Sequence, residues 1–251
     1  MIHFENICKE YSKELFKKGA MALRDVSFAL SEQQTLGLIG ANGAGKSTAI
    51  RLIMDFIRPD RGRITLFGRA GADVQQKRRI GYLPESAAFP ANLTIMDLVR
   101  YTARTCGLST TLHKERSTAL LRQLGLWEVR NKRLRTYSKG MQQRANFILA
   151  LLNDPDLLIL DEPMSGLDPI GRRQIIDLIQ QLKTEGKTIL FCSHILGDVD
   201  RLVDQLLVLH KGQVLFNGQP ADLLDRFGAA SIEEAYLALI AHQTGGHQHA
   251  A

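Results

Sequence analysis

Cysteines and long apolar runs are scarce in this chain of 251 residues, and each shortage excludes a class of protein. The three cysteines, Cys8, Cys106 and Cys192, are isolated and lack the spacing of metal ligands, so we expect reduced thiols. No apolar run approaches the roughly 18 residues that a membrane span needs, and the first residues lack the apolar region of a signal peptide. A disulfide scaffold and a membrane-spanning chain are excluded, and we expect the chain itself to stay in the cytoplasm.

The rest of the composition is that of an ordinary globular protein, with 45% hydrophobic and 23% charged residues. The formal net charge of +6 permits a nucleic acid or an anionic membrane surface as a neighbour. Two basic clusters, 77–79 and 130–135, contribute to this charge, but neither has the interleaved aromatic residues of a single-strand binder. The clusters favour a solvated surface, and nucleic acid is not the expected partner.

A glycine-rich stretch separates an apolar run, 35–39, from an apolar pattern of helical period, 49–54. Strand, glycine-rich turn and helix in this order form the context of a phosphate-binding loop, whereas an ordinary turn would match the spacing only by chance. Its glycines allow backbone N–H groups to face phosphate oxygens. Lys46 would reach the β- and γ-phosphates, and the Ser47 hydroxyl would ligate Mg²⁺. We therefore predict a nucleoside triphosphate bound by Gly40, Ala41, Asn42, Gly43, Ala44, Gly45, Lys46, Ser47 and Thr48.

The order of apolar runs predicts an α/β fold with an inserted helical part. Strands are expected over 2–7, 26–30, 63–67 and 80–85, with a lysine-rich turn from Lys13 to Gly19. A helical pattern follows from Thr94 to about Leu152. Strands then alternate with helices over 157–160, 171–184, 188–191, 195–203 and 205–210, which argues for a mostly parallel sheet. A hairpin turn at 211–212 leads to a strand at 214–216, and a last helix runs from Ser231 to Ile240 before a disordered tail from His242.

Two carboxylates end the apolar run 157–160. In a nucleotide site Asp161 would hold Mg²⁺, and Glu162 is placed to polarise a water for attack on the γ-phosphate. Acidic residues that merely end a strand are the alternative, which the phosphate loop disfavours. His194 follows another predicted core strand and could hydrogen-bond the γ-phosphate, although a lone histidine is more often structural.

A second predicted anion site lies at the start of a helix. Ser138 and Gly140 head the helix that runs to about Leu152, where the helix dipole favours negative charge. A plain helix cap explains the same spacing.

Together, these motifs resemble the nucleotide-binding subunit of an ABC transporter. The Walker A loop corresponds to 40–48, the Q-loop to 80–85, the signature to 137–142, Walker B to 157–162 and the D-loop to 165–168, with His194 as the switch histidine. The resemblance implies a P-loop NTPase (RecA-like) core with an antiparallel N-terminal portion and a helical subdomain. We expect the ATPase domain over 1–230, with core 1–85 and 155–230, helical subdomain 86–154, and a terminal helix and tail over 231–251.

The resemblance also implies ligands and partners. ATP and Mg²⁺ are expected, with Asp168 at the nucleotide and Tyr11 stacked on adenine; a plain surface tyrosine is the alternative for Tyr11. Two copies would dimerise head to tail, so that each ATP lies between Walker A of one chain and Ser138 and Gly140 of the other. A separate transmembrane permease would hold the dimer at the inner face of the cell membrane. Candidate contacts for a permease helix are Phe89, Leu93 and Ile95, for which a place in the core of the helical insert is the alternative.

Three positions depart from the usual family pattern. Lys139 replaces a glycine of the signature, and Met164 replaces the threonine after the Walker B proline. Glu85 replaces the Q-loop glutamine; an ionised carboxylate can ligate Mg²⁺ but cannot donate a hydrogen bond. The sequence around Glu85 and the signature resembles a bacterial subfamily, mostly exporters, in which a lone ATPase chain pairs with a separate permease.

The expected function is therefore an ATPase subunit that closes as a dimer on ATP and reopens after hydrolysis to drive transport. A soluble ABC ATPase acting on nucleic acid or ribosomes is the alternative, but one cassette without long inserts disfavours it. A regulatory nucleotide binder without turnover is disfavoured by the intact Lys46, Asp161, Glu162 and His194.

Overall fold

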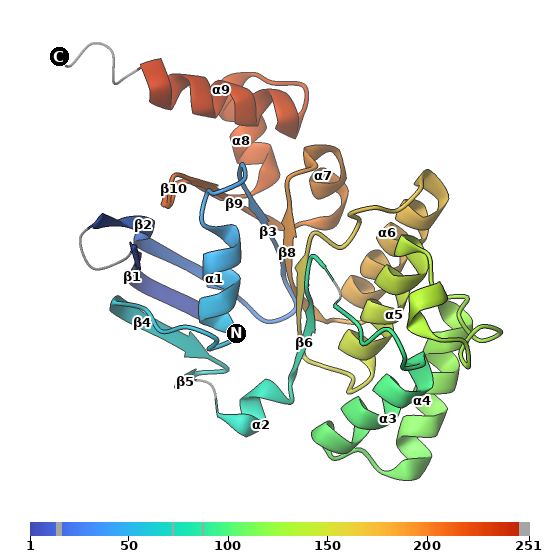
Figure 1. Cartoon of the computed structure of the whole chain (residues 1–251). Coiled ribbons are helices and arrows are strands. Elements are labelled where there is room, and N and C mark those ends of the chain that lie inside the picture. The colour runs from blue at the N-terminus through green and yellow to red at the C-terminus, as the bar shows by residue number, and fades with distance from the viewer. Residues whose placement is uncertain (14–16, 72, 87, 246–251) are drawn as a thin grey trace. The chain divides into compact units, whose positions relative to one another are not determined.

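The computed structural model describes residues 1–13, 17–71, 73–86 and 88–245 (Figure 1). The chain forms two compact units, which are described separately: Met1–Ala72 with Thr188–Ala251, and Asp73–Lys187. Among the helices in these described ranges, none has the length and apolar character to cross a membrane.

The first unit begins with an antiparallel sheet in the order β2-β1-β4-β5. Its strands are β1 (Ile2–Lys13), β2 (Lys17–Leu30), β4 (Arg61–Leu66) and β5 (Arg69–Ala70). Alternate residues face the core, and the rings of Phe4 and Phe28 stack with their centroids 4.5 Å apart. The predicted turn from Lys13 to Gly19 is too long, because Lys13 pairs with Lys17 across the hairpin; 14–16 lie outside the described residues.

Parallel strands form the other sheet of this unit. Strand β3 (Thr35–Ile39) pairs in parallel with β8 (Thr188–Ser193) and β9 (Gln205–His210), and β10 (Gln213–Gly218) is antiparallel to β9. Every residue of β3 and β8 is buried, as expected for short apolar runs in a parallel sheet. Helix α1 (Lys46–Ile53) follows β3. The predicted helix 195–203 is shorter, a 3₁₀ turn (Leu196–Asp198) followed by α7 (Val199–Leu202).

Two helices complete the described part of this unit, α8 (Pro220–Phe227) and α9 (Ile232–Gly245). Helix α8 was not expected. The predicted cap of α9 holds in part, because Ser231 Oγ accepts a hydrogen bond from Glu234 N at 3.2 Å, whereas the Glu234 carboxylate accepts from Ala230 N at 2.9 Å. The predicted tail from His242 is wrong for 242–245, which continue α9, and 246–251 lie outside the described residues.

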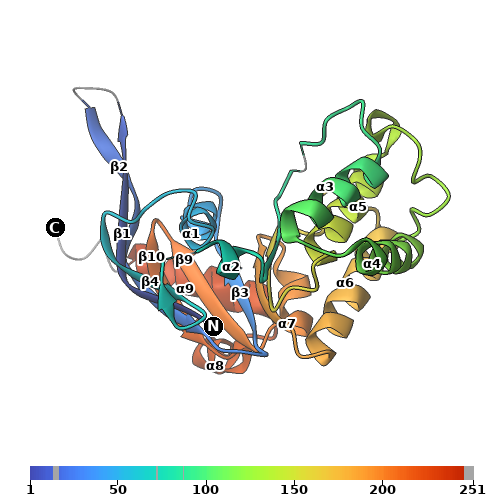
Figure 2. The same cartoon turned by 90° about the horizontal axis from the view of Figure 1, so that it is seen from below.

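The second unit combines two parallel strands with a group of helices. Strand β6 (Ile80–Leu83) pairs in parallel with β7 (Leu157–Asp161). Helices α3 (Ile95–Cys106), α4 (Thr110–Gln123) and α5 (Lys139–Leu151) pack side by side (Figure 2). The short helix α2 (Val74–Lys77), a 3₁₀ turn (Leu134–Thr136) and the long helix α6 (Pro169–Thr184) complete it. The predicted α/β fold with parallel pairing, an antiparallel N-terminal portion and inserted helices is confirmed; the domain boundaries stay a prediction.

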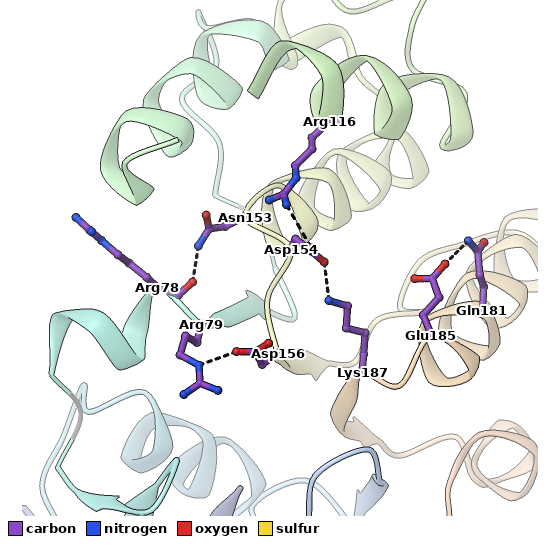
Figure 3. Close-up of polar contacts among 9 residues, drawn as sticks. All are labelled: Arg78, Arg79, Arg116, Asn153, Asp154, Asp156, Gln181, Glu185 and Lys187. Atoms are coloured by element: carbon purple, nitrogen blue, oxygen red, sulfur yellow. Dashed lines mark hydrogen bonds and ion pairs between the residues drawn. The ribbon is translucent and has the colours of Figure 1, made fainter. Parts of the chain in front are cut away.

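Hydrogen bonds fix the start of β7 beside the start of β6 (Figure 3). The backbone N–H groups of Asp156 and Leu157 both donate to the carbonyl of Arg79, at 3.0 and 3.1 Å. Arg79 Nε also reaches the Asp156 carboxylate at 2.6 Å, and the Asn153 amide donates to the carbonyl of Arg78. Since β7 is only five residues long, this anchoring also fixes its far end, where the predicted carboxylates lie.

Asp154 forms a second anchor in the same turn (Figure 3). Its carboxylate accepts from Lys187 Nζ at 2.5 Å and from Arg116 at 3.2 Å, so it ties α4 and the end of the unit to the turn before β7. The hydrogen bond from Lys187 is the main cause that holds the pKa of Asp154 below its usual value, and the positive charges of Lys187 and Arg116 add to it.

Candidate functional site

The loop between β3 and α1 is folded around the side chain of Lys46. Lys46 Nζ donates to the carbonyl of Gly40 at 2.6 Å and lies 3.4 Å from that of Ala41, and only 7% of the residue is exposed. Ala44 N donates back to Ala41 O at 3.0 Å, which closes the turn. The loop is thus a compact ring of backbone around one ammonium group.

Two glycines of the loop have no room for a side chain. A Cβ on Gly40 would lie 2.3 Å from the carbonyl oxygen of Leu209. Gly45 has a φ of +112° and a Cβ there would lie 2.7 Å from Leu23 Cδ2 and 2.8 Å from the carbonyl of Ala22. Glycine is therefore required by space at both positions and by conformation at Gly45.

The start of α1 presents N–H groups and a hydroxyl. The first N–H groups of a helix, here those of Lys46, Ser47 and Thr48, have no partner within the helix, and the helix dipole adds partial positive charge. Ser47 is exposed and Thr48 is buried. This geometry suits an anion with several oxygens, such as a phosphate.

His194 lies at the same edge of the sheet as the loop. Ile39 and Ser193 are partners in the parallel pairing of β3 and β8, and the next residues along the two strands are Gly40 and His194. His194 is exposed there. The structure therefore brings the histidine to the edge where the loop begins, as the sequence predicted for a strand end.

Tyr11 lies in the β1–β2 hairpin of the first unit, opposite Ala20. Its hydroxyl is buried and has no hydrogen-bond partner in the part of the chain that the structure describes. The stacking on adenine that the family resemblance implies stays a prediction.

Asp161 and Glu162 end β7 in the second unit, and both are buried, at 6% and 7% exposure. Glu162 has a φ of +49°, a left-handed conformation that a residue other than glycine adopts at a cost. Its carbonyl accepts from Ser165 N at 3.0 Å, so the chain turns sharply directly after the strand. Strain of this kind at a strand end is common where a side chain must point at a ligand.

Ser138 is the N-cap of α5 and accepts from Met141 N at 3.3 Å. Tyr137 before it is buried; burial raises the pKa of its hydroxyl, which stays a neutral donor to the carbonyl of Val129 at 3.0 Å. A Cβ on Gly140 would lie 3.5 Å from Leu167 Cδ2, an ordinary contact. The expected helix N-terminus is therefore present, and its role toward an anion stays a prediction.

The remaining predicted residues of the second unit have mixed environments. Glu85 follows β6 and is exposed, and Asp168 caps α6 by accepting from Gly171 N at 2.8 Å. Leu93 is 37% exposed, but Ile95 is fully buried in the unit. Ile95 is therefore wrong as a candidate surface contact, because it is the first residue of α3 on the core side.

Two polar residues that the sequence did not single out are buried in α5, and each bonds to the backbone of a residue adjacent in sequence to Glu162 or Glu85. Gln143 Nε2 donates to the carbonyl of Pro163 at 2.8 Å, and Asn146 Nδ2 donates to the carbonyl of Pro84 at 3.2 Å. Each residue is 5% exposed. The available signal was two amide side chains, three positions apart, in a helix whose following residues are apolar.

The predicted residues are thus divided between the units. The first unit holds the loop from Gly40 to Thr48, His194 and Tyr11, and the second holds Glu85, Ser138, Gly140, Asp161, Glu162 and Asp168. The structure brings the loop and the histidine to one edge in the first unit. In the second unit, α5 contacts the two segments that carry Glu162 and Glu85.

The family model for ABC transporter matches residues 23–165 of the chain. The chain belongs to this family. It is 42% identical over 205 residues to an uncharacterized ABC transporter ATP-binding protein of Synechocystis, an alignment that covers 81% of this chain and 58% of that protein. The chain therefore spans less than two thirds of the length of that relative.

Other relatives match over more of their length. The linearmycin resistance ATP-binding protein LnrL of Bacillus subtilis is 34% identical over 250 residues, which covers 96% of this chain and 78% of that protein. A solved structure of an ATP-binding subunit of an ABC transporter superposes with a TM-score of 0.85 at 32% identity and covers 96% of this chain and 99% of that one. The P-loop NTPase fold expected from the motifs is confirmed.

Proposed function

We propose that this chain binds and hydrolyses ATP as the nucleotide-binding subunit of an ABC transporter. The observation that carries the proposal is the compact loop at the start of α1, with the Lys46 ammonium held 2.6 Å from the Gly40 carbonyl and the helix N–H groups beside it. Membership in the ABC transporter family supports the choice of ATP as the triphosphate.

Lys46 would bind the triphosphate by exchanging one acceptor for another. Its ammonium now donates to a neutral carbonyl, and phosphate oxygens offer a charged acceptor with stronger hydrogen bonds. The N–H groups of Ser47 and Thr48 would orient the same phosphates. His194, at the same sheet edge, would donate to the γ-phosphate and report its presence.

Glu162 would act as general base in hydrolysis. A carboxylate at 7% exposure is protected from bulk water, and it can accept a proton from the water that attacks the γ-phosphate in line. Its left-handed backbone, with a φ of +49°, ends the extended course of β7 at this residue. Asp161, one residue earlier, would point to the other side of the strand end.

The oxygen ligands on these elements fit Mg²⁺, which prefers hydroxyl, carboxylate and phosphate oxygens. Ser47 and Asp161 would hold it, with Glu85 as a further carboxylate. The ion would neutralise charge on the β- and γ-phosphates.

The chain would act as a head-to-tail pair with a second copy, each ATP lying between the loop of one copy and Ser138 and Gly140 of the other. The pair would sit on a transmembrane permease at the inner face of the cell membrane. Similarity to a Nod factor export ATP-binding protein of Rhizobium etli, 34% identical over 237 residues with 94% of this chain and 73% of that protein covered, supports an exporter.

Substitution of Glu162 tests the proposal. Glu162→Gln keeps the size and shape of the side chain but removes the base. ATP should still bind, and the closed dimer should accumulate because hydrolysis no longer reopens it. Size-exclusion chromatography with ATP and an ATPase assay measure both effects. A monomer with wild-type turnover would reject Glu162 as the base.

A further inference from the structure

One face of helix α5 contacts the two segments that carry Glu162 and Glu85 of the proposed site. Lys139, Gln143 and Asn146 are spaced by four and three residues, so their side chains leave the helix on the same side. Gln143 and Asn146 each contact the backbone next to a glutamate of the proposed site, and Lys139 lies against the turn between Glu162 and Asp168.

Gln143 contacts the segment after Glu162. Its side-chain amide donates to the carbonyl of Pro163 at 2.8 Å in a buried environment. The carbonyl would be left unsatisfied without this donor, because the bond is shielded from water at both ends. Since Glu162 is held in a left-handed conformation directly before Pro163, a shift of this carbonyl would also turn the Glu162 side chain.

Asn146 makes the same kind of contact one turn further along. Its amide donates to the carbonyl of Pro84 at 3.2 Å, and the next residue is Glu85. Glu85 itself is exposed at the end of β6. The direction in which the chain leaves β6, and with it the position of the Glu85 carboxylate, is therefore set by a side chain of α5.

Lys139 contacts the turn that follows Glu162 from the beginning of the helix. A Cβ on Gly166 would lie 2.3 Å from Lys139 Cε and 2.5 Å from Cδ, so the aliphatic part of the lysine lies directly on this glycine. Gly166 has a φ of +72° and belongs to the turn between Glu162 and Asp168. The residue that departs from the usual signature thus packs on the neighbouring loop.

We propose that Gln143 and Asn146 are positioning residues, Gln143 for Glu162 and Asn146 for Glu85. This inference rests on the proposed function. Through these two bonds the helix that begins at Ser138 and the two glutamate segments form one rigid arrangement. A change in the tilt of α5 is thereby transmitted to the catalytic base and to the metal-binding carboxylate by separate contacts.

The two contacts have separable consequences, which distinguishes positioning from general stability. Gln143→Met keeps the length of the side chain and removes the donor, and it should lower kcat by about tenfold or more while the KM for ATP stays the same, as for a misplaced base. Asn146→Leu should raise the Mg²⁺ concentration for half-maximal activity severalfold, with a smaller effect on kcat. Gln123→Met is the matched control, because Gln123 pairs with Gln181 on the surface of the same unit, and it should behave as wild type.

Steady-state kinetics over ATP and Mg²⁺, with melting temperatures for each variant, test this assignment. A double variant with Glu162→Gln adds a second check: Gln143→Met should lower the residual activity no further when the base is already absent. A wild-type kcat in Gln143→Met would overturn the proposal. So would a result in which both variants change kcat and Mg²⁺ dependence together, in proportion to their loss of melting temperature. Full turnover in Glu162→Gln would reject only the role of Glu162 as the base, whereas a wild-type chain that hydrolyses no ATP would reject the proposed function itself.

Discussion

At the scale of single residues, Lys46 carries a charge that is almost fully buried. A positive charge at 7% exposure is costly unless hydrogen bonds replace its water, and two loop carbonyls do so here. In the proposed site the same ammonium would bind the phosphates, and we expect the loop to rearrange little when the nucleotide binds.

Removal of this ammonium should abolish tight nucleotide binding. We expect Lys46→Ala to weaken ATP binding by at least about a hundredfold, because charge-assisted hydrogen bonds to phosphate are among the strongest in proteins. Fluorescent-nucleotide titration measures the affinity. Lys132→Ala removes the same charge from an exposed lysine of the other unit and should bind ATP normally; unchanged affinity in Lys46→Ala would contradict the loop assignment.

The ion pairs of Asp154 lead to a prediction of how the free energy of unfolding depends on pH. Its folded pKa is lowered chiefly by the Lys187 hydrogen bond, so its contribution is complete above the unfolded pKa, near 3.8, and is lost as pH falls through the folded pKa. Asp154→Asn should therefore lower the free energy of unfolding near pH 7 but not at the acid end.

The size of the Asp154 effect is limited by solvent. The carboxylate is 54% exposed, and exposed ion pairs contribute about 1 kcal/mol or less. Urea unfolding between about pH 7 and 3 measures the difference from wild type. Asp177→Asn, which breaks the exposed pair with Arg173 within one helix, is the comparison and should cost less. A difference that stays constant over the pH range would contradict the electrostatic origin.

At the scale of elements, the start of α3 depends on a reciprocal cap. Thr94 Oγ1 accepts from Asp97 N at 3.2 Å, and the Asp97 carboxylate accepts from Thr94 N at 2.9 Å. The hydrogen bond from the Thr94 backbone is also the main cause that lowers the pKa of Asp97. Two N–H groups that the helix cannot satisfy are thereby satisfied.

Thr94→Ala should destabilise the protein by about 1 kcal/mol, the usual cost of losing an N-cap side chain. Thr94→Ser keeps the hydroxyl and should restore most of the loss. Thermal or urea unfolding compares the two variants with wild type. Equal losses in both would assign the effect to the lost methyl group rather than to the cap.

Elements with a strong local signal were predictable from the sequence. The short apolar runs of β3 and β7 and the turn chemistry around Gly40 identified parallel strands, and the turn at Gly212 identified the antiparallel hairpin of β9 and β10. Helix α8 was missed although Pro220 at its start and Gly228 after its end are typical helix boundaries. The length of β1 was underestimated, because its register shifts interrupt the alternation of apolar and polar residues.

The sequence predicted the motifs of the candidate site, but not the residues that hold the backbone of those motifs in place. Residues such as Lys46 and Glu162 belong to local patterns with a chemical reason for each position. The acceptors of Gln143 and Asn146 lie 20 and 62 residues away along the chain. The folded unit shows that these side-chain amides donate to the carbonyls of Pro163 and Pro84. Their positions in α5 can be related to the proposed site only from these contacts.

At the scale of the whole molecule, the proposed function makes each ATP site a joint product of two chains. The loop and the two carboxylates would come from one copy, and Ser138 with Gly140 from the other. Defects on the two sides should therefore complement each other in a mixed dimer, whereas defects on the same side should not.

Mixing experiments with inactive variants test this division. Lys46→Ala damages the loop side, and Ser138→Arg blocks the signature side, so each should be inactive alone. In an equal mixture half of the dimers combine the two chains, and one of the two sites in each is intact, which predicts about a quarter of wild-type ATPase activity. Lys46→Ala mixed with Glu162→Gln places both defects on the loop side and should stay inactive. Equal recovery in the two mixtures would reject the shared site, as would no recovery from chains that demonstrably exchange partners.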